Sequence, residues 1–144
     1  MKFMAIQKAT KDAEAGVMPT TEQITAMVSF HEEMVKAGVL LAADGLYPSS
    51  KGARVKFSGK KRTVTDGPFA ETKELVAGFW ILQVRSLEEA IEWVKRIPNV
   101  WREDQEIEIR QVIDAEDFEP VTPELSARID RMHETVGDKA SGTR

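Results

Sequence analysis

The 144-residue chain contains no cysteine and only two histidines. The absence of cysteine excludes disulfides, thiolate catalysis and zinc or iron–sulfur sites held by cysteine. Two histidines leave few ways to build a histidine-based metal site or a nucleophile–base pair. Motifs for binding phosphate, dinucleotides or metals are also missing, so we expect no cofactor and no metal.

Long hydrophobic runs are missing as well. No stretch approaches the roughly 20 apolar residues of a membrane-spanning helix, and the N-terminus lacks the pattern of a signal peptide. The formal charge is −4, whereas nucleic-acid binding depends on an excess of lysine and arginine. We therefore expect a cytoplasmic protein that binds neither membranes nor nucleic acids.

Periodic apolar patterns predict one α+β domain made of two strand–helix–strand halves. Strands are expected at residues 2–7, 39–43, 76–84 and 106–113, and helices at residues 20–37 and 86–96. Thr20 with Gln23 and Ser86 with Glu89 have the spacing of capping boxes. The order, βαββαβ, matches the split βαβ arrangement of ferredoxin-like domains.

A hairpin between the two halves and the inward face of the first helix can also be predicted. Residues 54–57 and 62–65 surround a short turn that contains glycine, which predicts a β-hairpin inserted between the halves. The inward face of the first helix is expected to carry these residues: Ile24, Met27, Val28, His31, Met34 and Val35.

The strand expected at residues 76–84 is apolar on both faces. Phe79 and Ile81 point to one side, and Trp80 and Leu82 point to the other. The helices of a two-layer domain cover only one of these faces, so the second face needs another cover. We therefore expect a homodimer in which two sheets stack into a dimeric α+β barrel-type assembly.

The domain is expected to span residues 1–115, followed by a C-terminal extension at 116–144. Within the extension, Leu125, Ile129 and Met132 recur at helical spacing, which predicts an amphipathic helix at residues 122–136. Its apolar stripe is too narrow for a free helix, so we expect it to pack on the domain or on the dimer mate. Residues 137–144 carry no pattern and are expected to be disordered.

Residues 64–74 form the loop whose members are hardest to replace. Pro68 restricts its own φ angle and that of Gly67, which tolerates unusual backbone angles. The Asp66 carboxylate is expected to be buried or half-buried and to accept N–H groups of its own loop. Phe69 is expected to anchor the turn. Two interpretations remain open: a shaped turn that joins the halves, or a turn that also lines a ligand pocket.

The candidates for a functional site come from this loop and its surroundings. His31 and Asp66 are the catalytic candidates, although a histidine on an apolar helix face is also typical of a core residue. The ligand-binding candidates lie in the loop, in the hairpin or at a strand end, and are Asp44, Arg54, Asp66, Gly67, Pro68, Phe69, Glu71 and Lys73. Six basic residues and no acid lie between residues 51 and 62. Two interpretations remain open: an ordinary solvated hairpin, or a segment that attracts a small anionic ligand or an acidic partner.

The run from Asp66 to Glu74, DGPFAETKE, resembles the signature of the DGPF subgroup of YCII-related proteins. Residues 37–41, 45–48, 52–55 and 87–93 are similar to this subgroup at matching places, so the resemblance covers roughly residues 2–113. It implies a small ferredoxin-like domain that pairs into a dimer, in a family for which enzymatic roles have been suggested.

The resemblance also bears on chemistry and partners. YCII-related proteins are thought to use a His–Asp pair, and the matching positions here are Met27 and Ile97. His31 stands one helical turn after Met27. DGPF proteins are often linked to extracytoplasmic-function sigma factors, which implies a protein partner of the sigma-factor type.

Three functions follow as alternatives. The first is a dimeric small-molecule-binding protein or enzyme with a polar cleft near the loop at residues 64–74. The second is a non-catalytic regulatory module that acts through a protein partner, and the third is a purely structural dimer. A pocket with converging titratable groups would favour the first, and a flat charged surface would favour the second.

Overall fold

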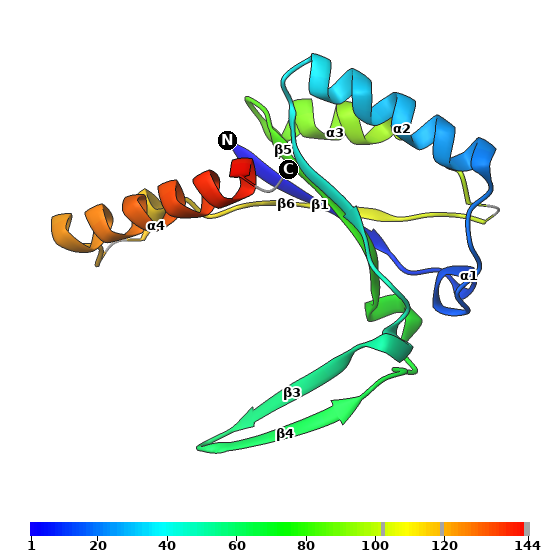
Figure 1. The fold of residues 1–144 in the computed structure, drawn as a ribbon, viewed down its shortest axis with the longest axis horizontal. Coiled ribbons are helices and arrows are strands. Elements are labelled where there is room, and N and C mark those ends of the chain that lie inside the picture. The colour runs from blue at the N-terminus through cyan, green and yellow to red at the C-terminus, as the bar shows by residue number, and fades with distance from the viewer. Residues whose placement is uncertain (102, 119, 143–144) are drawn as a thin grey trace. The chain divides into compact units, whose positions relative to one another are not determined.

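The computed structural model describes residues 1–101, 103–118 and 120–142 (Figure 1). The chain forms two compact units, Met1–Val112 and Ile113–Arg144. The first unit contains all the described strands and the helices α1 to α3, and the second contains α4. The division falls three residues before the boundary expected from the sequence.

A four-stranded antiparallel sheet forms the centre of the first unit. Its strands are β1 (Lys2–Lys8), β2 (Leu40–Gly45), β5 (Val76–Gln83) and β6 (Ile107–Gln111), in the order β2-β5-β1-β6. Because β1 and β2 are both antiparallel to β5, they are parallel to each other with one strand between them. This is a split βαβ arrangement, and the mixed α+β fold with an antiparallel sheet is consistent with a ferredoxin-like domain.

The helices α2 (Thr21–Lys36) and α3 (Leu87–Lys95) cover one face of this sheet (Figure 1). The capping box predicted for α2 is confirmed, since Thr20 and Gln23 exchange both hydrogen bonds. At α3 only half of the predicted box forms. The Ser86 hydroxyl accepts the Glu89 N–H at 3.1 Å, but the Glu89 carboxylate accepts the N–H of Arg85.

The core lies between the helices and the sheet. Its buried residues are Phe3, Ala5, Phe30, Met34, Val39, Trp80, Leu82, Val84 and Ala90. Part of the inward face predicted for α2 is wrong, because Ile24, Val28 and Val35 are 48%, 46% and 62% exposed. The buried stripe instead runs through Phe30, whose ring packs against Trp93 of α3 with 6.2 Å between ring centroids.

The sheet face opposite α2 and α3 is apolar in its middle. We call it the open face and define it by Met4, Ile6, Phe79 and Ile81, which the strand register places opposite one another in pairs. All four are half-buried. The open face has charged residues at its β6 edge, where Lys8 and Glu108 form an ion pair at 3.6 Å. The sheet therefore has a second apolar face, as expected from the sequence.

The predicted hairpin is present as β3 (Ala53–Ser58) and β4 (Lys61–Asp66). Every residue of both strands is exposed. Figure 1 shows the hairpin extending from the sheet on the side away from α2 and α3. Short turns flank it at η1 (Ser49–Lys51) and η2 (Thr72–Glu74), and a one-turn helix that the sequence did not predict, α1 (Lys11–Glu14), follows β1.

The second unit consists of a short turn, η3 (Ala115–Asp117), and the helix α4 (Pro123–Gly142). The Thr122 hydroxyl accepts the N–H of Leu125 at 3.2 Å, which caps the helix with Pro123 in its first turn. The helix continues past the expected end at residue 136, because extending a helix costs less than starting one. Disorder of the C-terminal tail stays a prediction. Residues 143–144 lie outside the described residues. How the apolar stripe of α4 packs stays a prediction. Among the described residues, no helix is long and apolar enough to cross a membrane.

Candidate functional site

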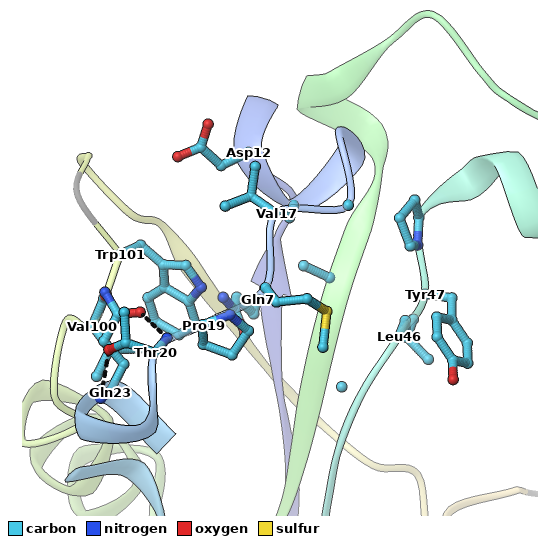
Figure 2. A pocket seen from close by; sticks show the side chains of 16 residues that line it. Gln7, Asp12, Val17, Pro19, Thr20, Gln23, Leu46, Tyr47, Val100 and Trp101 are labelled. Atoms are coloured by element: carbon cyan, nitrogen blue, oxygen red, sulfur yellow. Dashed lines mark hydrogen bonds between the residues drawn. The ribbon is translucent and has the colours of Figure 1, made fainter. Parts of the chain in front are cut away.

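A cavity of about 500 Å³ lies where β1 and β2 end and β5 begins (Figure 2). Its walls come from α1, the loop before α2, the first turn of α2, the segment after β2 and the loop after α3. The lining residues are Gln7, Asp12, Ala13, Gly16, Val17, Met18, Pro19, Thr20, Gln23, Gly45, Leu46, Tyr47, Pro48, Ala77, Val100 and Trp101.

Gln7 is the buried polar residue of this cavity, with only 6% of its surface exposed. It follows Phe3 and Ala5 on the inward side of β1, and its Nε2 donates to Oε1 of Gln105 at 3.3 Å. Gly78 stands opposite Gln7 on β5. A Cβ atom at Gly78 would lie 3.2 Å from Gln7 Oε1, so the absence of a side chain at this position leaves room for the carboxamide.

One wall of the cavity is held together by Gln23 in the first turn of α2. Its Oε1 accepts the N–H of Thr20 at 2.8 Å, and its Nε2 donates to the carbonyl of Val100 at 2.5 Å. Both bonds are drawn in Figure 2. They join the start of α2 to the loop that carries Trp101, so one side chain both caps a helix and positions an aromatic wall.

The opposite wall is held by α1. Thr10, which is 7% exposed, caps α1 by accepting the N–H of Ala13 at 3.0 Å. The Glu14 carboxylate then accepts the N–H of Ser49 at 3.0 Å and its O–H at 2.6 Å. These bonds attach α1 to the segment that carries Tyr47 and Pro48, since Ser49 directly follows that segment.

The loop after β4 is fastened to the same serine. The Ser49 hydroxyl accepts the N–H of Phe69 at 3.0 Å, and Gly67 donates its N–H to the carbonyl of Gly52 at 2.9 Å. A Cβ atom at Gly67 would overlap the Ser49 carbonyl, so only glycine fits there without a shift. The Gly67–Pro68 peptide is cis. We call Glu14, Ser49, Gly67 and Phe69 the Ser49 junction.

The profile of the YCII-related domain matches residues 1–116. The chain belongs to the family of YCII-related proteins. An uncharacterized protein of Rhizobium meliloti (strain 1021) is 38% identical over 65 residues, which are 45% of this chain and 52% of that protein. The match therefore spans about half the length of that relative.

A solved structure can also be superimposed. It is that of 5-chloro-2-hydroxyhydroquinone dehydrochlorinase from Burkholderia phenoliruptrix AC1100 in complex with 2,5-dihydroxybenzoquinone. The TM-score is 0.45 at 12% sequence identity, and the match covers 81% of this chain and 97% of that chain.

In this YCII-related domain, Asp66 is exposed at the end of β4. Within the described part of the chain, no hydrogen bond to its carboxylate is present. The expectation that Asp66 is buried and bonded within its loop is therefore wrong. The physical reason is that β4 belongs to a hairpin that no other layer of its unit covers, and the loop amides of Gly67 and Phe69 bond to Gly52 and Ser49 instead.

Two other candidates, Arg54 of the hairpin and Phe69 of the loop, are in contact outside the cavity. The Arg54 guanidinium lies over the Phe69 ring, 3.9 Å from its centroid. The protonated carboxyl of Glu74 donates a hydrogen bond to the Glu71 carboxylate. This bond and the like charge of Glu71 raise the pKa of Glu74 above its ordinary value, and the charge of Arg54 partly offsets this. Arg54 and Glu71 are exposed, and Phe69 is half-buried.

None of the eight predicted ligand-binding residues lines the cavity. Gly67 and Phe69 support its wall through Ser49, while Pro68 and Lys73 are exposed. Asp44 stands opposite Phe79, at the edge of the open face, although the next residue, Gly45, does line the cavity. A ligand-binding role for these residues stays a prediction.

His31 lies between α2 and the sheet. Its Nε2 accepts the indole N–H of Trp80 at 2.9 Å, and burial lowers its pKa below the ordinary value. A neutral imidazole whose Nε2 is already engaged is typical of a core histidine. His31 does not line the cavity, and the positions that match the family's His–Asp pair, Met27 and Ile97, pack against the core.

Sequence reasoning missed the residues that build the cavity: Gln7, Glu14, Ser49 and Trp101. Gln7 left a signal, because it is a polar residue at the next inward position after Phe3 and Ala5. Glu14 and Ser49 left none, since each resembles an ordinary surface residue until the chain brings them together.

The charge of the lining residues limits what the cavity can hold. Asp12 and Tyr47 are its titratable side chains, and neither lysine, arginine nor histidine is among the residues that line it. The remaining walls are mostly apolar or aromatic. The Lys51 ammonium already lies 4.0 Å from the centroid of the Tyr47 ring, so the arrangement suits binding of a small uncharged ligand.

Proposed function

We propose that this protein is a homodimeric small-molecule-binding protein of the DGPF subgroup of YCII-related proteins, with its ligand in the cavity at the end of the sheet. The observation that carries this proposal is the cavity itself. Its volume of about 500 Å³ suits a small organic ligand. Its mostly apolar walls, with one buried carboxamide at Gln7, have the composition of ligand sites.

The proposed ligand is flat and has no negative charge. Trp101 and Tyr47 offer aromatic surface, and the carboxamide of Gln7 offers a directional hydrogen bond. An anion in the cavity would meet Asp12 without a basic side chain from the lining to neutralise it. A small anionic ligand would instead bind the basic segment at residues 51–62, outside the cavity.

Binding rather than catalysis is proposed for this cavity. General acid–base chemistry needs a group whose pKa lies near the working pH and which reaches the ligand. His31 has its Nε2 bonded to Trp80 and does not line the cavity. A reaction in the cavity would therefore depend on Asp12 or Tyr47.

Ligand binding is tested by filling the cavity. Ala13 lines it and Ala15 does not, although both belong to or adjoin α1. We expect Ala13→Leu to abolish the thermal shift and the tryptophan-fluorescence change caused by hits from a panel of uncharged aromatic compounds. Ala15→Leu is the matched control and should keep both. Hits that bind the two variants equally well would contradict the assignment of the cavity.

The dimer is proposed to form through the open face. Four half-buried apolar residues in the middle of a sheet, with charged residues at the edge, resemble the core and rim of an interface. Phe79→Asp would place a charge in the centre of that contact, and we expect it to yield a monomer by sedimentation velocity. Wild-type protein that is monomeric at micromolar concentration would count against the dimer.

The alternative is a regulatory module that acts through a protein partner of the sigma-factor type. The fully exposed basic hairpin favours it, because Lys56 and Lys61 lie on its polar face. A purified sigma factor that binds the wild type but not Lys56→Glu/Lys61→Glu would support this alternative. If Ala13→Leu leaves that binding unchanged, the partner does not act through the cavity.

A further inference from the structure

The two faces of the β3–β4 hairpin differ in chemistry. The register places Val55 opposite Val64 and Phe57 opposite Arg62 on one face. Val55, Phe57 and Val64 are 51%, 70% and 64% exposed, and we call them the apolar face of the hairpin. The other face carries Arg54, Lys56, Thr63 and Thr65.

The apolar face has no cover in the described part of the first unit. Isolated two-stranded hairpins are at best marginally stable in water, because nothing shields their hydrogen bonds or their apolar side chains. The Arg62 guanidinium lies 4.3 Å from the Phe57 ring centroid, which shields one ring only in part. The apolar face therefore requires a partner surface.

The hairpin is attached firmly at its base. The N–H of Gly67, directly after β4, bonds to the carbonyl of Gly52, directly before β3. The Ser49 junction fastens the following loop to α1. These bonds fix the direction in which the hairpin extends from the sheet. Figure 1 shows that this direction lies on the side of the sheet away from α2 and α3, which is the side of the open face.

The distribution of charge along the chain indicates which partner surface the hairpin meets. Residues 51–62 hold six of the twenty basic residues and no acidic one. The rest of the chain consequently carries fourteen basic against twenty-four acidic residues. A second copy of this chain therefore offers a surface of the opposite charge, and a two-fold axis would let each hairpin meet the other copy in the same way.

We propose that the β3–β4 hairpin is an arm that grips a second copy of this chain, with Val55, Phe57 and Val64 packed against the partner's body. The inference rests on the dimer of the proposed function and adds a contact region outside the open face. The arm contributes apolar burial through these three side chains and electrostatic attraction through the basic segment.

The apolar contact is tested by an isosteric exchange. Val55→Thr/Val64→Thr keeps branched side chains that suit a strand but makes the face polar. We expect sedimentation velocity over a dilution series to show a dimer dissociation constant raised by about tenfold or more. The matched control, Thr63→Val/Thr65→Val, makes the reverse exchange on the other face and should leave the constant within about twofold of the wild-type value.

The position of the arm is tested by cross-linking. Because the chain lacks cysteine, Lys60→Cys at the hairpin turn takes a single benzophenone maleimide label. Illumination should produce a covalent dimer whose cross-link maps to a peptide outside residues 51–62. Cross-links confined to the labelled chain itself would contradict the proposal.

The two proposals can fail separately. If Phe79→Asp gives a monomer but the hairpin variant dimerises like the wild type, the open-face dimer stands and the arm is overturned. If the control variant weakens the dimer as much as Val55→Thr/Val64→Thr does, the effect comes from the hairpin as a whole and the arm is again overturned. A wild-type monomer at all concentrations overturns both.

Discussion

The four-stranded sheet and the β3–β4 hairpin have the same kind of antiparallel hydrogen bonding but are stabilised by different means. In the sheet, inward side chains such as Phe3 and Leu82 are 2% and 0% exposed beneath two helices. In the hairpin, every residue of both strands is exposed. Backbone hydrogen bonds alone therefore do not distinguish the core of this protein from an extension that needs contacts elsewhere.

The hairpin is held in place at its base and not by packing along its strands. Its conformation is held at the base, by close packing of Gly67 on Ser49 and by the bonds of Glu14 and Phe69 to Ser49. The same junction holds one wall of the cavity. A change at the junction should therefore affect both the hairpin and the cavity, whereas a change along the hairpin should affect neither the core nor the cavity.

The largest expected effect comes from deleting a core side chain. Leu82→Ala should lower the free energy of unfolding by about 2–5 kcal/mol, because Leu82 is fully buried and the change leaves a cavity. Val64→Ala, which shortens an exposed hairpin residue, should change the stability of the monomer by less than about 1 kcal/mol. Urea denaturation at low protein concentration measures both, and equal losses would break the comparison between sheet and hairpin.

Gly67→Ala should have the next largest effect. Its Cβ would overlap the Ser49 carbonyl, so the junction must shift, at a cost of about 1–3 kcal/mol. Hydrogen exchange should show faster exchange at both the hairpin base and α1. Gly52→Ala is the matched control, because a Cβ there would meet the Ser49 carbonyl oxygen at an ordinary 3.5 Å. A Gly67→Ala protein as stable as this control would contradict the role assigned to the junction.

Glu14→Gln should have a smaller effect. The amide can still accept one of the two hydrogen bonds from Ser49, but it loses the charge that strengthens them, so a loss of about 1 kcal/mol is expected. Ligand affinity should fall together with stability, since α1 forms a cavity wall. Glu32→Gln, at an exposed position of α2, serves as the control for loss of a charge. An unchanged ligand affinity would show that the Ser49 junction does not influence binding in the cavity.

The smallest expected effect is a pH dependence that comes from His31. Burial lowers the pKa of His31 in the folded state, so the unfolded chain takes up this proton first as the pH falls. The contribution of His31 to the free energy of unfolding is complete above the ordinary histidine pKa of about 6.5 and is lost as the pH falls below it. His31→Gln keeps an acceptor for the Trp80 N–H and should flatten the decrease in melting temperature between about pH 7 and pH 5.

The matched control for this prediction is the second histidine. His133 is exposed on α4, so His133→Gln should leave the pH dependence of the melting temperature as it is in the wild type. A His31→Gln protein with the wild-type slope would show that other groups cause the pH dependence.

Much of the fold could be predicted because its signals are local. The capping box of Thr20 and Gln23 depends on residues three positions apart, and the strand periodicity around Phe79 depends on alternate neighbours. The resemblance to YCII-related proteins agreed with these patterns over the first unit. The rotation of α2 was not predictable in this way, because it depends on the packing of Phe30 against Trp93 of another helix.

The candidate site was predicted less well. The loop at residues 64–74 was correctly singled out as unusual, but Asp66 is exposed and the loop acts through Ser49 rather than through its own carboxylate. Gln7 could have been noticed as a polar residue among inward strand positions. Nothing near Glu14 or Ser49 in the sequence indicates that they meet.

The sequence by itself therefore determined the order of the elements and the apolar character of both sheet faces, since each depends on a few neighbouring residues. Only the tertiary structure decided where the cavity lies and what holds its walls. Glu14, Ser49 and Phe69 are 35 and 20 positions apart along the chain. Their hydrogen bonds form only because the antiparallel sheet brings the ends of β1 and β2 together with the start of β5, and pairing across such distances leaves no local pattern.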